Sequence, residues 1–201
     1  MAIKQIDIGM IPAIVGRVSY TGDLGYEIWV ATAYLNSLFD QFMTAGAAHH
    51  IRLFGSRALN ALRLEKNYGS WGREYRPTYG PIETGLDAFV AYDKPANFIG
   101  KSGALAERDS EGTMRLCSFV IEAKDADVIG DEPIAHNGTV VGWVTSGGYA
   151  HGAGKSMAQG YVPKNIADDD SGWSVELLGQ ILPAKRQKFP LFDANASRMR
   201  S

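Results

Sequence analysis

The sequence predicts an α+β fold in which residues 1–110 mix strands with helices, while residues 113–201 form only strands and turns. Three observations carry this prediction. Strand-like and helix-like hydrophobic patterns alternate through the first part of the chain. A charged stretch that ends in glycine, residues 107–112, follows the last helical pattern and marks the boundary between the two parts. After it come six short apolar runs separated by turn residues.

The composition excludes several classes of protein. With 45% hydrophobic and 21% charged residues among 201, the chain is an ordinary globular protein. A formal net charge of −2 argues against nucleic acid and anionic membranes as partners. The single cysteine, Cys117, excludes an internal disulfide and fits a reducing compartment, so we expect a cytoplasmic protein. No signal peptide opens the sequence, and no apolar run is long enough to cross a bilayer.

The first expected element is a hairpin. Its two β-rich runs, residues 14–20 and 26–32, flank a turn at residues 21–25 whose glycines supply positive φ angles. Glu27 lies just past this turn in an apolar run, where an acid is costly to bury unless donors face it. Those donors come either from a backbone turn or an arginine, or from a ligand with two adjacent N–H groups. The aminopyrimidinone edge of a pterin is such a ligand.

Two amphipathic helices are expected next. The first spans residues 34–48, with Thr32 as its N-cap and an apolar face packed on the core. The second spans residues 55–67, with Ser56 as its N-cap. Its inward residues are expected to be Ala58, Leu59, Ala61 and Leu62. Arg63 lies among them, either as a structural arginine paired with a carboxylate or as a fork for a ligand carboxylate.

The stretch of residues 68–83 is irregular and rich in aromatic side chains. Its rings are Tyr68, Trp71, Tyr75 and Tyr79. A polar loop normally avoids so many large rings, so we expect them either to line or cover a cleft or to pack against a neighbouring domain. A short strand over residues 85–92 and a helix over residues 101–108 are expected to follow.

Strands and turns fill the remainder of the chain. The six expected strands cover residues 116–121, 133–135, 139–144, 156–162, 174–178 and 180–185. The second and third are joined through Asn137 and Gly138, and Asn-Gly is a strong signal for a two-residue hairpin. Six short strands at this spacing predict a small β-barrel or a jelly-roll-like module.

Motifs for nucleotide, metal and nucleophilic chemistry are absent from the sequence. The stretch of residues 147–156 ends in Gly-Lys-Ser, but Tyr149 stands where a phosphate-binding loop requires glycine, and a strand rather than a helix follows. No G-x-G-x-x-G follows a strand, so a dinucleotide site has no support. No nucleophile–His–acid set and no metal-ligand spacing appear. We therefore predict no metal site and no catalytic residue in this chain.

Several motifs fall in one order along nearly the whole chain. The most diagnostic are Y-T-G-D-L-G-Y-E-I at 20–28 and N-A-L-R-L-E-K at 60–66. The others are W-G-R-E at 71–74, P-I-E-T-G-L at 81–86, K-P-A-N-F-I-G-K at 94–101, V-T-S-G-G-Y at 144–149 and R-M-R at 198–200. With these motifs the sequence resembles the C-terminal half of the folate-dependent aminomethyltransferase family, the T-protein of the glycine cleavage system. Within that family it resembles the tetrahydrofolate-binding portion of dimethylglycine and sarcosine dehydrogenases.

The resemblance implies a fold, a cofactor and a site. The fold is part of a folate-binding domain, a mixed sheet with helices, followed by a C-terminal β-barrel. The cofactor is tetrahydrofolate. By motif, Glu27 corresponds to the glutamate that takes the N–H edge of the pterin, Tyr20 to the tyrosine that lines the cleft, and Arg63 to the arginine that orders the same site. Further contacts are implied for Ile28, Trp29, Tyr68 and Trp71.

The resemblance also implies what must come from elsewhere. Family members carry a catalytic aspartate and part of the pterin pocket in an N-terminal half that precedes the matching region. FAD is expected only if an upstream flavin domain or subunit exists. A partner chain that supplies the N-terminal half or the flavin domain is therefore expected, beside folate and a substrate derived from a methylated amine.

The implied function is one-carbon transfer, in which a one-carbon unit from a methylated amine is captured as 5,10-methylenetetrahydrofolate. This reaction belongs to the transferases and oxidoreductases of one-carbon metabolism. Two alternatives remain open: a non-catalytic folate-binding subunit that needs a partner chain, and a folate-dependent sulfonium demethylase.

Overall fold

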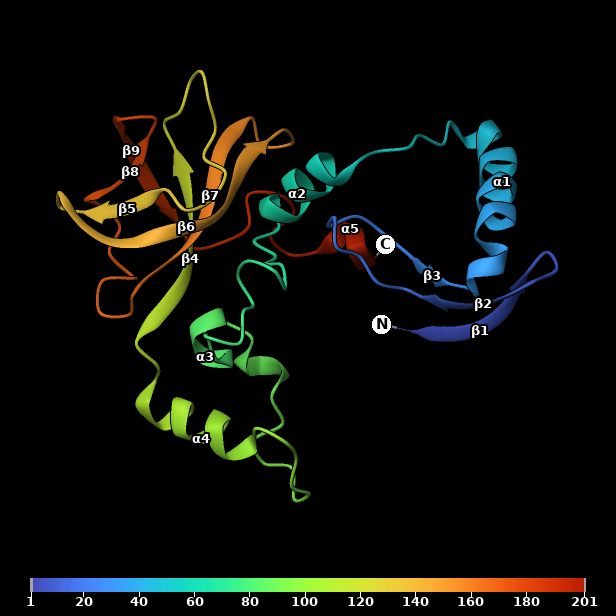
Figure 1. Cartoon of the computed structure of the whole chain (residues 1–201), viewed down its shortest axis with the longest axis horizontal. Coiled ribbons are helices and arrows are strands. Elements are labelled where there is room, and N and C mark those ends of the chain that lie inside the picture. The colour runs from blue at the N-terminus through green and yellow to red at the C-terminus, as the bar shows by residue number, and fades with distance from the viewer. Residues whose placement is uncertain (1, 201) are drawn as a thin grey trace.

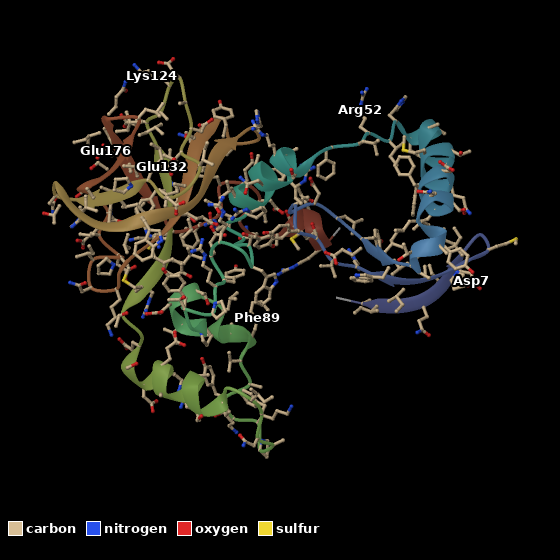
Figure 2. The ribbon with its side chains drawn as sticks, in the orientation of Figure 1. Asp7, Arg52, Phe89, Lys124, Glu132 and Glu176 are labelled. Atoms are coloured by element: carbon tan, nitrogen blue, oxygen red, sulfur yellow. The ribbon has the colours of Figure 1, made fainter. Side chains whose placement is uncertain are left out.

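The computed structural model describes residues 2–200 and shows an N-terminal part and a barrel on either side of helix α2 (Figure 1). Asp7 and Arg52 lie at one end of the molecule, and Lys124 and Glu176 lie at the other (Figure 2). The mixture of sheets and helices with a C-terminal barrel confirms the predicted fold class. Helix α2 and the irregular segment after it connect the two parts, so this region positions the candidate site.

The N-terminal part contains a three-stranded antiparallel sheet. Its strands are β1 (Ile3–Ile8), β2 (Ile11–Gly16) and β3 (Glu27–Trp29), in the order β1-β2-β3. Strands β2 and β3 pair as expected, but Gly16 faces Glu27, so residues 17–26 form a longer loop than the predicted turn. Tyr20 lies outside the β2–β3 pairing, and its hydroxyl instead donates to the backbone oxygen of Gly69 at 2.8 Å. A tertiary contact has therefore replaced the local pairing.

Glu27 is exposed at the start of β3, which corrects the expectation of a buried acid. The strand lies at the edge of the sheet, so its carboxylate side chain remains open to water. The apolar residues around Glu27 identify a strand, but they do not determine whether anything covers that strand.

Helix α1 (Leu35–Gly46) confirms the first predicted helix and lies between short 3₁₀ turns η1 (Thr32–Tyr34) and η2 (Ala47–His49). The expected N-cap is wrong, because Thr32 belongs to η1 and Tyr34 precedes the α-helix without a side-chain cap. The expected core packing is also wrong for most of the helix. Leu38 is its one buried residue, while the apolar side chains of Leu35, Phe39 and Phe42 are exposed.

Helix α2 (Ser56–Glu65) confirms the second predicted helix, although Gly55 rather than Ser56 occupies the N-cap position. Its buried residues are Ala61, Arg63, Leu64 and Glu65. The expected inward position of Ala58 is wrong, since it is exposed, and Leu59 and Leu62 are only partly buried. The helix contacts strands β6 and β7 of the barrel and its buried residues lie in its C-terminal half, so burial begins one turn later than the apolar pattern suggests.

The connecting arm runs from α2 to the barrel. It contains α3 (Pro81–Thr84), η3 (Asp87–Phe89) and α4 (Lys101–Ser110), the last of which confirms the predicted third helix. The predicted strand over residues 85–92 is wrong. Gly85 ends α3 with a φ of 72° and redirects the chain into the 3₁₀ turn, which leaves Phe89 exposed (Figure 2).

The six predicted strands form a closed barrel in the order β4-β7-β6-β5-β8-β9. They are β4 (Met114–Ile121), β5 (Pro133–His136), β6 (Thr139–Ala150), β7 (Lys155–Pro163), β8 (Trp173–Leu177) and β9 (Gln180–Gln187). The predicted hairpin after β5 is confirmed, since Asn137 and Gly138 have φ angles of 50° and 79°. The barrel holds the main hydrophobic core, with Phe119, Ile134 and Val175 fully buried.

The C-terminal segment returns from the barrel to α2 and ends in the short helix α5 (Ser197–Arg200). Along this path the ammonium group of Lys66 donates to the backbone oxygen of Asp193 at 2.7 Å. Arg198 then pairs with Asp23 in the loop after β2. The end of the chain thus ties that loop to α2.

Candidate functional site

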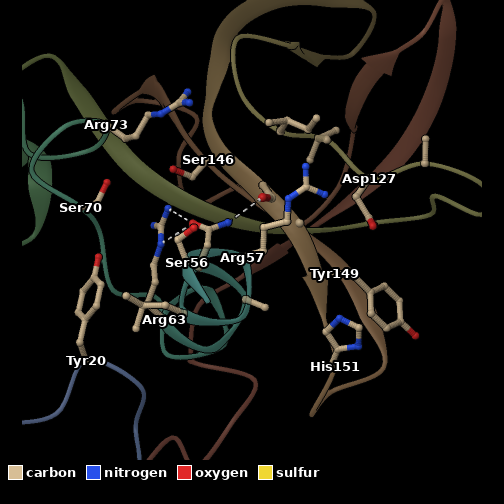
Figure 3. Close-up of a pocket in the computed structure, with 18 residues that line it drawn as sticks. Tyr20, Ser56, Arg57, Arg63, Ser70, Arg73, Asp127, Ser146, Tyr149 and His151 are labelled. Carbon is tan, nitrogen blue, oxygen red and sulfur yellow. Dashed lines mark hydrogen bonds between the residues drawn. The ribbon is translucent and has the colours of Figure 1, made fainter. Parts of the chain in front are cut away.

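A cavity of about 810 Å³ lies between α2, the irregular segment and one side of the barrel (Figure 3). Tyr20 reaches it from the loop after β2, Arg63 from α2, and Ser70 from the irregular segment. The barrel contributes Ser146 to Tyr149 of β6 and residues 126–129 of the preceding loop. Regions distant in sequence therefore meet around one space of the size that small-molecule ligands occupy.

Arg63 is the most extensively bonded side chain in this wall. The residue is 3% exposed, and both Nε and Nη2 of its guanidinium donate to Oδ1 of Asn60, at 3.0 and 2.7 Å. Nη1 donates to the backbone oxygen of Tyr68 at 2.9 Å, to Glu74 at 3.2 Å and to Oε1 of Gln159 at 2.7 Å. The structural role weighed for this arginine is therefore present, and the side chain also lines the cavity.

Glu74 is the carboxylate of that pair, and it is fully buried. Its Oε1 accepts from the hydroxyl of Thr145 at 2.6 Å, and its Oε2 accepts from the backbone N–H of Ser70 at 2.8 Å. Burial raises the pKa of Glu74, but the Arg63 charge and these hydrogen bonds outweigh it and leave the pKa below its ordinary value. Glu74 is therefore a carboxylate, and it holds the Arg63 guanidinium in place.

Tyr20 lines the cavity beside Arg63 (Figure 3), and its ring is nearly parallel to that of Tyr68, at 6.3 Å between centroids. Burial raises the pKa of Tyr20, so the hydroxyl keeps its proton and donates to Gly69. This bond and the ring contact hold the loop after β2 against the irregular segment.

The rim of the cavity is cationic. Arg57 and Arg73 line it together with His151, whereas Asp127 is the acid among the lining residues (Figure 3). Arg73 donates to the backbone oxygen of Thr145 at 3.4 Å, which orients it along the barrel. The charge balance of the rim favours a ligand with an anionic end.

The structure brings Tyr20, Arg63 and Tyr68 together, since Tyr68 stacks on Tyr20 and accepts from Arg63 through its backbone oxygen, and it places the other predicted site residues elsewhere. Tyr20 and Arg63 line the cavity. Glu27, Ile28, Trp29, Tyr68 and Trp71 are not among its lining residues. Trp29 lines a second hollow, of about 670 Å³, beside β1 and β2, and Trp71 is 82% exposed.

Sequence reasoning missed the partners of Arg63. Glu74 and Thr145 enter the sequence analysis only as letters of the motifs W-G-R-E and V-T-S-G-G-Y, and Gln159 enters it only as part of the expected strand over residues 156–162. The pairing of Glu74 with Arg63 could have been predicted from one signal. An acid buried in an aromatic stretch needs a cation, and a buried arginine needs a carboxylate. Thr145 and Gln159 lie far along the chain and carry no local signal.

The irregular segment of residues 68–83 lines the cavity through Ser70 and Arg73, and it also packs on the barrel. Tyr79 stacks on Tyr161 of β7 with 3.6 Å between ring centroids. Of the two alternatives weighed for these rings, packing against a neighbouring part of the chain therefore occurs at Tyr79. None of the four rings is among the residues that line the cavity, and Tyr68 only supports the lining residue Tyr20 from behind.

Comparison with known proteins identifies the family of this chain. The family model described as "GCVT N-terminal domain" matches residues 1–94, and that described as "Glycine cleavage T-protein C-terminal barrel domain" matches residues 115–193. The chain belongs to the glycine cleavage T-protein family. As part of this family it shares its fold with the aminomethyltransferase T of Bartonella henselae, with a TM-score of 0.82 at 22% identity over 90% of this chain and 50% of that one.

Two relatives show how this T-protein family member compares in length. Mouse mitochondrial dimethylglycine dehydrogenase is 40% identical over 98% of the chain, which spans 23% of that enzyme. The aminomethyltransferase of Desulforamulus reducens is 29% identical over 90% of the chain, which spans 50% of it. The chain thus covers between about a quarter and half of these relatives.

Neither a metal-binding cluster nor a membrane-spanning helix occurs in residues 2–200. That region contains no group of three or more His, Cys, Asp or Glu side chains arranged to hold a metal ion. Within the same residues, none of the helices has the length and apolar character needed to cross a membrane.

Proposed function

We propose that this chain is the tetrahydrofolate-binding portion of a one-carbon-transfer enzyme of the dimethylglycine or sarcosine dehydrogenase type, or of an aminomethyltransferase. Residues 1–110 would form part of the folate-binding region, and residues 113–201 the barrel domain. The observation that carries the proposal is the buried Arg63, held by Glu74 at the wall of a cavity that Tyr20 also lines.

The size of the cavity and the charges around it support folate as the ligand. Its volume of about 810 Å³ lies within the range of pockets that bind small ligands. A flat pterin ring suits the face of Tyr20, and the carboxylates of the folate tail suit the arginine-rich rim. Tetrahydrofolate, when bound, supplies the nitrogen that captures the one-carbon unit as 5,10-methylenetetrahydrofolate.

Within this chain the residues bind and orient rather than transfer protons. Arg63 retains one Nη2 N–H without a partner among residues 2–200, and this donor is available to the ligand. Glu27 is proposed to take the N–H edge of the pterin, with Ile28, Trp29, Tyr68 and Trp71 as supporting contacts. Because Glu27 lies outside the cavity lining, this contact requires a partner polypeptide that completes the pocket and supplies the catalytic aspartate.

Calorimetry tests the proposal. We expect tetrahydrofolate to bind weakly or not at all to the chain alone, and much more tightly once a polypeptide corresponding to the N-terminal half of an aminomethyltransferase is added. In the completed protein, Glu27→Ala removes a charge-assisted contact and should cost about 1.5–3 kcal/mol of binding. Unchanged folate affinity after Glu27→Ala would remove Glu27 from the site.

A second candidate function is a non-catalytic subunit that completes its site with another chain. The exposed apolar face of α1 favours it, since Leu35, Phe39 and Phe42 need a cover. Purification from the native source distinguishes the two, because a subunit should co-purify with a stable partner.

A sulfonium compound as the methyl donor would keep the same folate site. Methyl transfer assays with amine and sulfonium substrates distinguish this reaction from the amine route.

For the compartment we propose the cytoplasm, on the ground that Cys117 is a free, buried thiol.

A further inference from the structure

Glu74 is held from several directions, although it lies in a segment without helix or strand. Two of its donors, the N–H and the hydroxyl of Ser70, come from the same segment at 2.8 and 3.3 Å. A third, the hydroxyl of Thr145, comes from β6 at 2.6 Å. The backbone oxygen of Glu74 accepts from Tyr161 of β7 at 2.8 Å. A carboxylate fixed in this way has one position relative to the barrel.

The guanidinium of Arg63 is fixed by two sets of acceptors on different edges. Asn60 accepts from the Nε and Nη2 edge, so it sets the direction of the side chain along the helix. Glu74, Gln159 and the backbone oxygen of Tyr68 accept from Nη1, at 3.2, 2.7 and 2.9 Å, and set the rotation of the plane. Only the remaining Nη2 donor is without a partner in the described part of the chain. The plane of the guanidinium therefore decides where that donor points.

We propose that Glu74 is a positioning residue, which holds the guanidinium plane of Arg63 so that its remaining donor faces the ligand cavity. The inference rests on the proposed function, since it takes the ligand of that cavity to be a folate. The other two acceptors of Nη1, Gln159 and the backbone oxygen of Tyr68, are neutral and tolerate a rotated or displaced guanidinium, whereas the buried carboxylate of Glu74 forms a stronger, charge-assisted hydrogen bond.

Glu74→Gln is the test variant, and Glu83→Gln is its matched control. Glu83 also joins the connecting arm to the barrel, with one carboxylate oxygen accepting from the N–H groups of Thr113 and Met114 at 2.8 and 3.0 Å. Its hydrogen bonds go to that junction rather than to Arg63. Both variants should lower the melting temperature, so loss of stability alone does not distinguish a positioning role.

The distinguishing readout is the Arg63 side-chain signal in a ¹⁵N NMR spectrum of the full chain. In the unmodified protein we expect a slowly exchanging Nε–H and separate Nη signals, as for a guanidinium held on both edges. Glu74→Gln should clearly speed exchange of the Nε–H and merge the Nη signals, while Glu83→Gln should leave both unchanged. Equal changes in the two variants, or no change in Glu74→Gln, would overturn the proposal.

Folate affinity is measured in parallel by calorimetry with tetrahydrofolate on the chain completed by its partner polypeptide. We expect a loss of about tenfold in Glu74→Gln and none in Glu83→Gln. The effect should be absent in an Arg63→Lys background, because Glu74 acts through Arg63. A tenfold loss that persists in the Arg63→Lys background would overturn the proposal, since Glu74 would then act on the ligand by another route.

The proposed function and the role of Glu74 can fail separately. If the unmodified, completed protein binds no folate while the NMR changes occur as expected, the proposed function fails and the control of Arg63 by Glu74 stands. If Glu74→Gln does not fold, Thr145→Val replaces it, since it removes one donor to Glu74 and leaves the ion pair. Thr145→Val should then produce a smaller change of the same kind in the Arg63 signals, and an unchanged spectrum would overturn the proposal.

Discussion

The hydroxyl of Tyr161 donates to the backbone oxygen of Glu74 at 2.8 Å, and both residues are fully buried. Tyr161 belongs to β7 of the barrel, and Glu74 belongs to the irregular segment after α2. The bond therefore joins the barrel to the residue that fixes Arg63. Its removal affects the stability of the fold, which can be measured without any ligand.

Tyr161→Phe keeps the ring stacked on Tyr79 and leaves the oxygen of Glu74 buried without this donor. We expect the free energy of unfolding to fall by about 1–3 kcal/mol, the cost of an unsatisfied buried group. Urea denaturation measures it. Tyr149→Phe is the control, because that ring is partly exposed and a surface change should stay within about 0.5 kcal/mol.

Arg63→Met should be among the most destabilising substitutions in the chain. It leaves the Glu74 carboxylate buried without its cation, at a cost of about 3–5 kcal/mol. Combining it with Glu74→Gln removes the uncompensated charge and should recover part of the loss in the same denaturation experiment. If the double variant is no more stable than Arg63→Met, the buried charge is not the cause.

The acid limb of the stability profile should contain a contribution from Glu74. Its pKa in the folded protein lies below the ordinary value of 4.5, so the unfolded chain binds the proton more readily. The stabilising contribution of Glu74 is therefore present in full when the pH is above the ordinary pKa. It is lost as the pH falls through the lower pKa that Glu74 has in the folded protein. Melting temperatures between about pH 6 and about pH 3 should fall less steeply in Glu74→Gln. Parallel curves would refute the assignment.

Cys117 should be unreactive in the folded protein. Burial raises the pKa of its thiol to about 11, so little thiolate exists near neutral pH. At about pH 8 we expect reaction with a disulfide reagent on the order of a hundredfold slower in the native protein than in urea. The absorbance of the released thiol measures both rates, and equal rates would show that the strand β4 opens readily.

Two glycines predict opposite responses to alanine. A Cβ on Gly160 would lie 2.4 Å from the backbone oxygen of Trp143, so Gly160→Ala should destabilise the barrel by about 1–3 kcal/mol. Gly103 lies inside α4 with nothing within 4 Å of an added Cβ, so Gly103→Ala should stabilise by about 0.5–1 kcal/mol. Thermal unfolding of the two variants gives the signs directly, and a stabilised Gly160→Ala would mean that β6 and β7 are farther apart.

The barrel was predictable because its strands and turns carry local signals. Asn137 and Gly138 adopt the left-handed angles that their residue types favour. The N-terminal part was less predictable, because the pattern around Glu27 shows a strand but not whether its face is covered. The strand expected over residues 85–92 failed since the bend at Gly85 prevails over a short apolar run.

The candidate site was predictable only in part. Arg63 and Asn60 share a helical spacing that can be read from the sequence, and in the structure Asn60 accepts from Arg63 at 3.0 Å. Glu74 follows in a segment without periodicity, and Gln159 comes from a strand far along the chain. Only the closed barrel brings these acceptors to the helix, so no local pattern could have assigned them.

The two walls of the cavity belong to different parts of the chain, which are linked by residues 50–55 without helix or strand (Figure 1). Tyr20 lies in the loop after β2, whereas Arg63 lies in α2, which packs on the barrel. A ligand that contacts both residues needs both in their binding positions. Its apparent affinity is therefore reduced in proportion to the fraction of the protein in which both are in place. The Asp23–Arg198 ion pair helps to hold the loop that carries Tyr20, and salt screens such an exposed pair. High salt should therefore lower the affinity of the cavity for its ligand, even for an uncharged ligand.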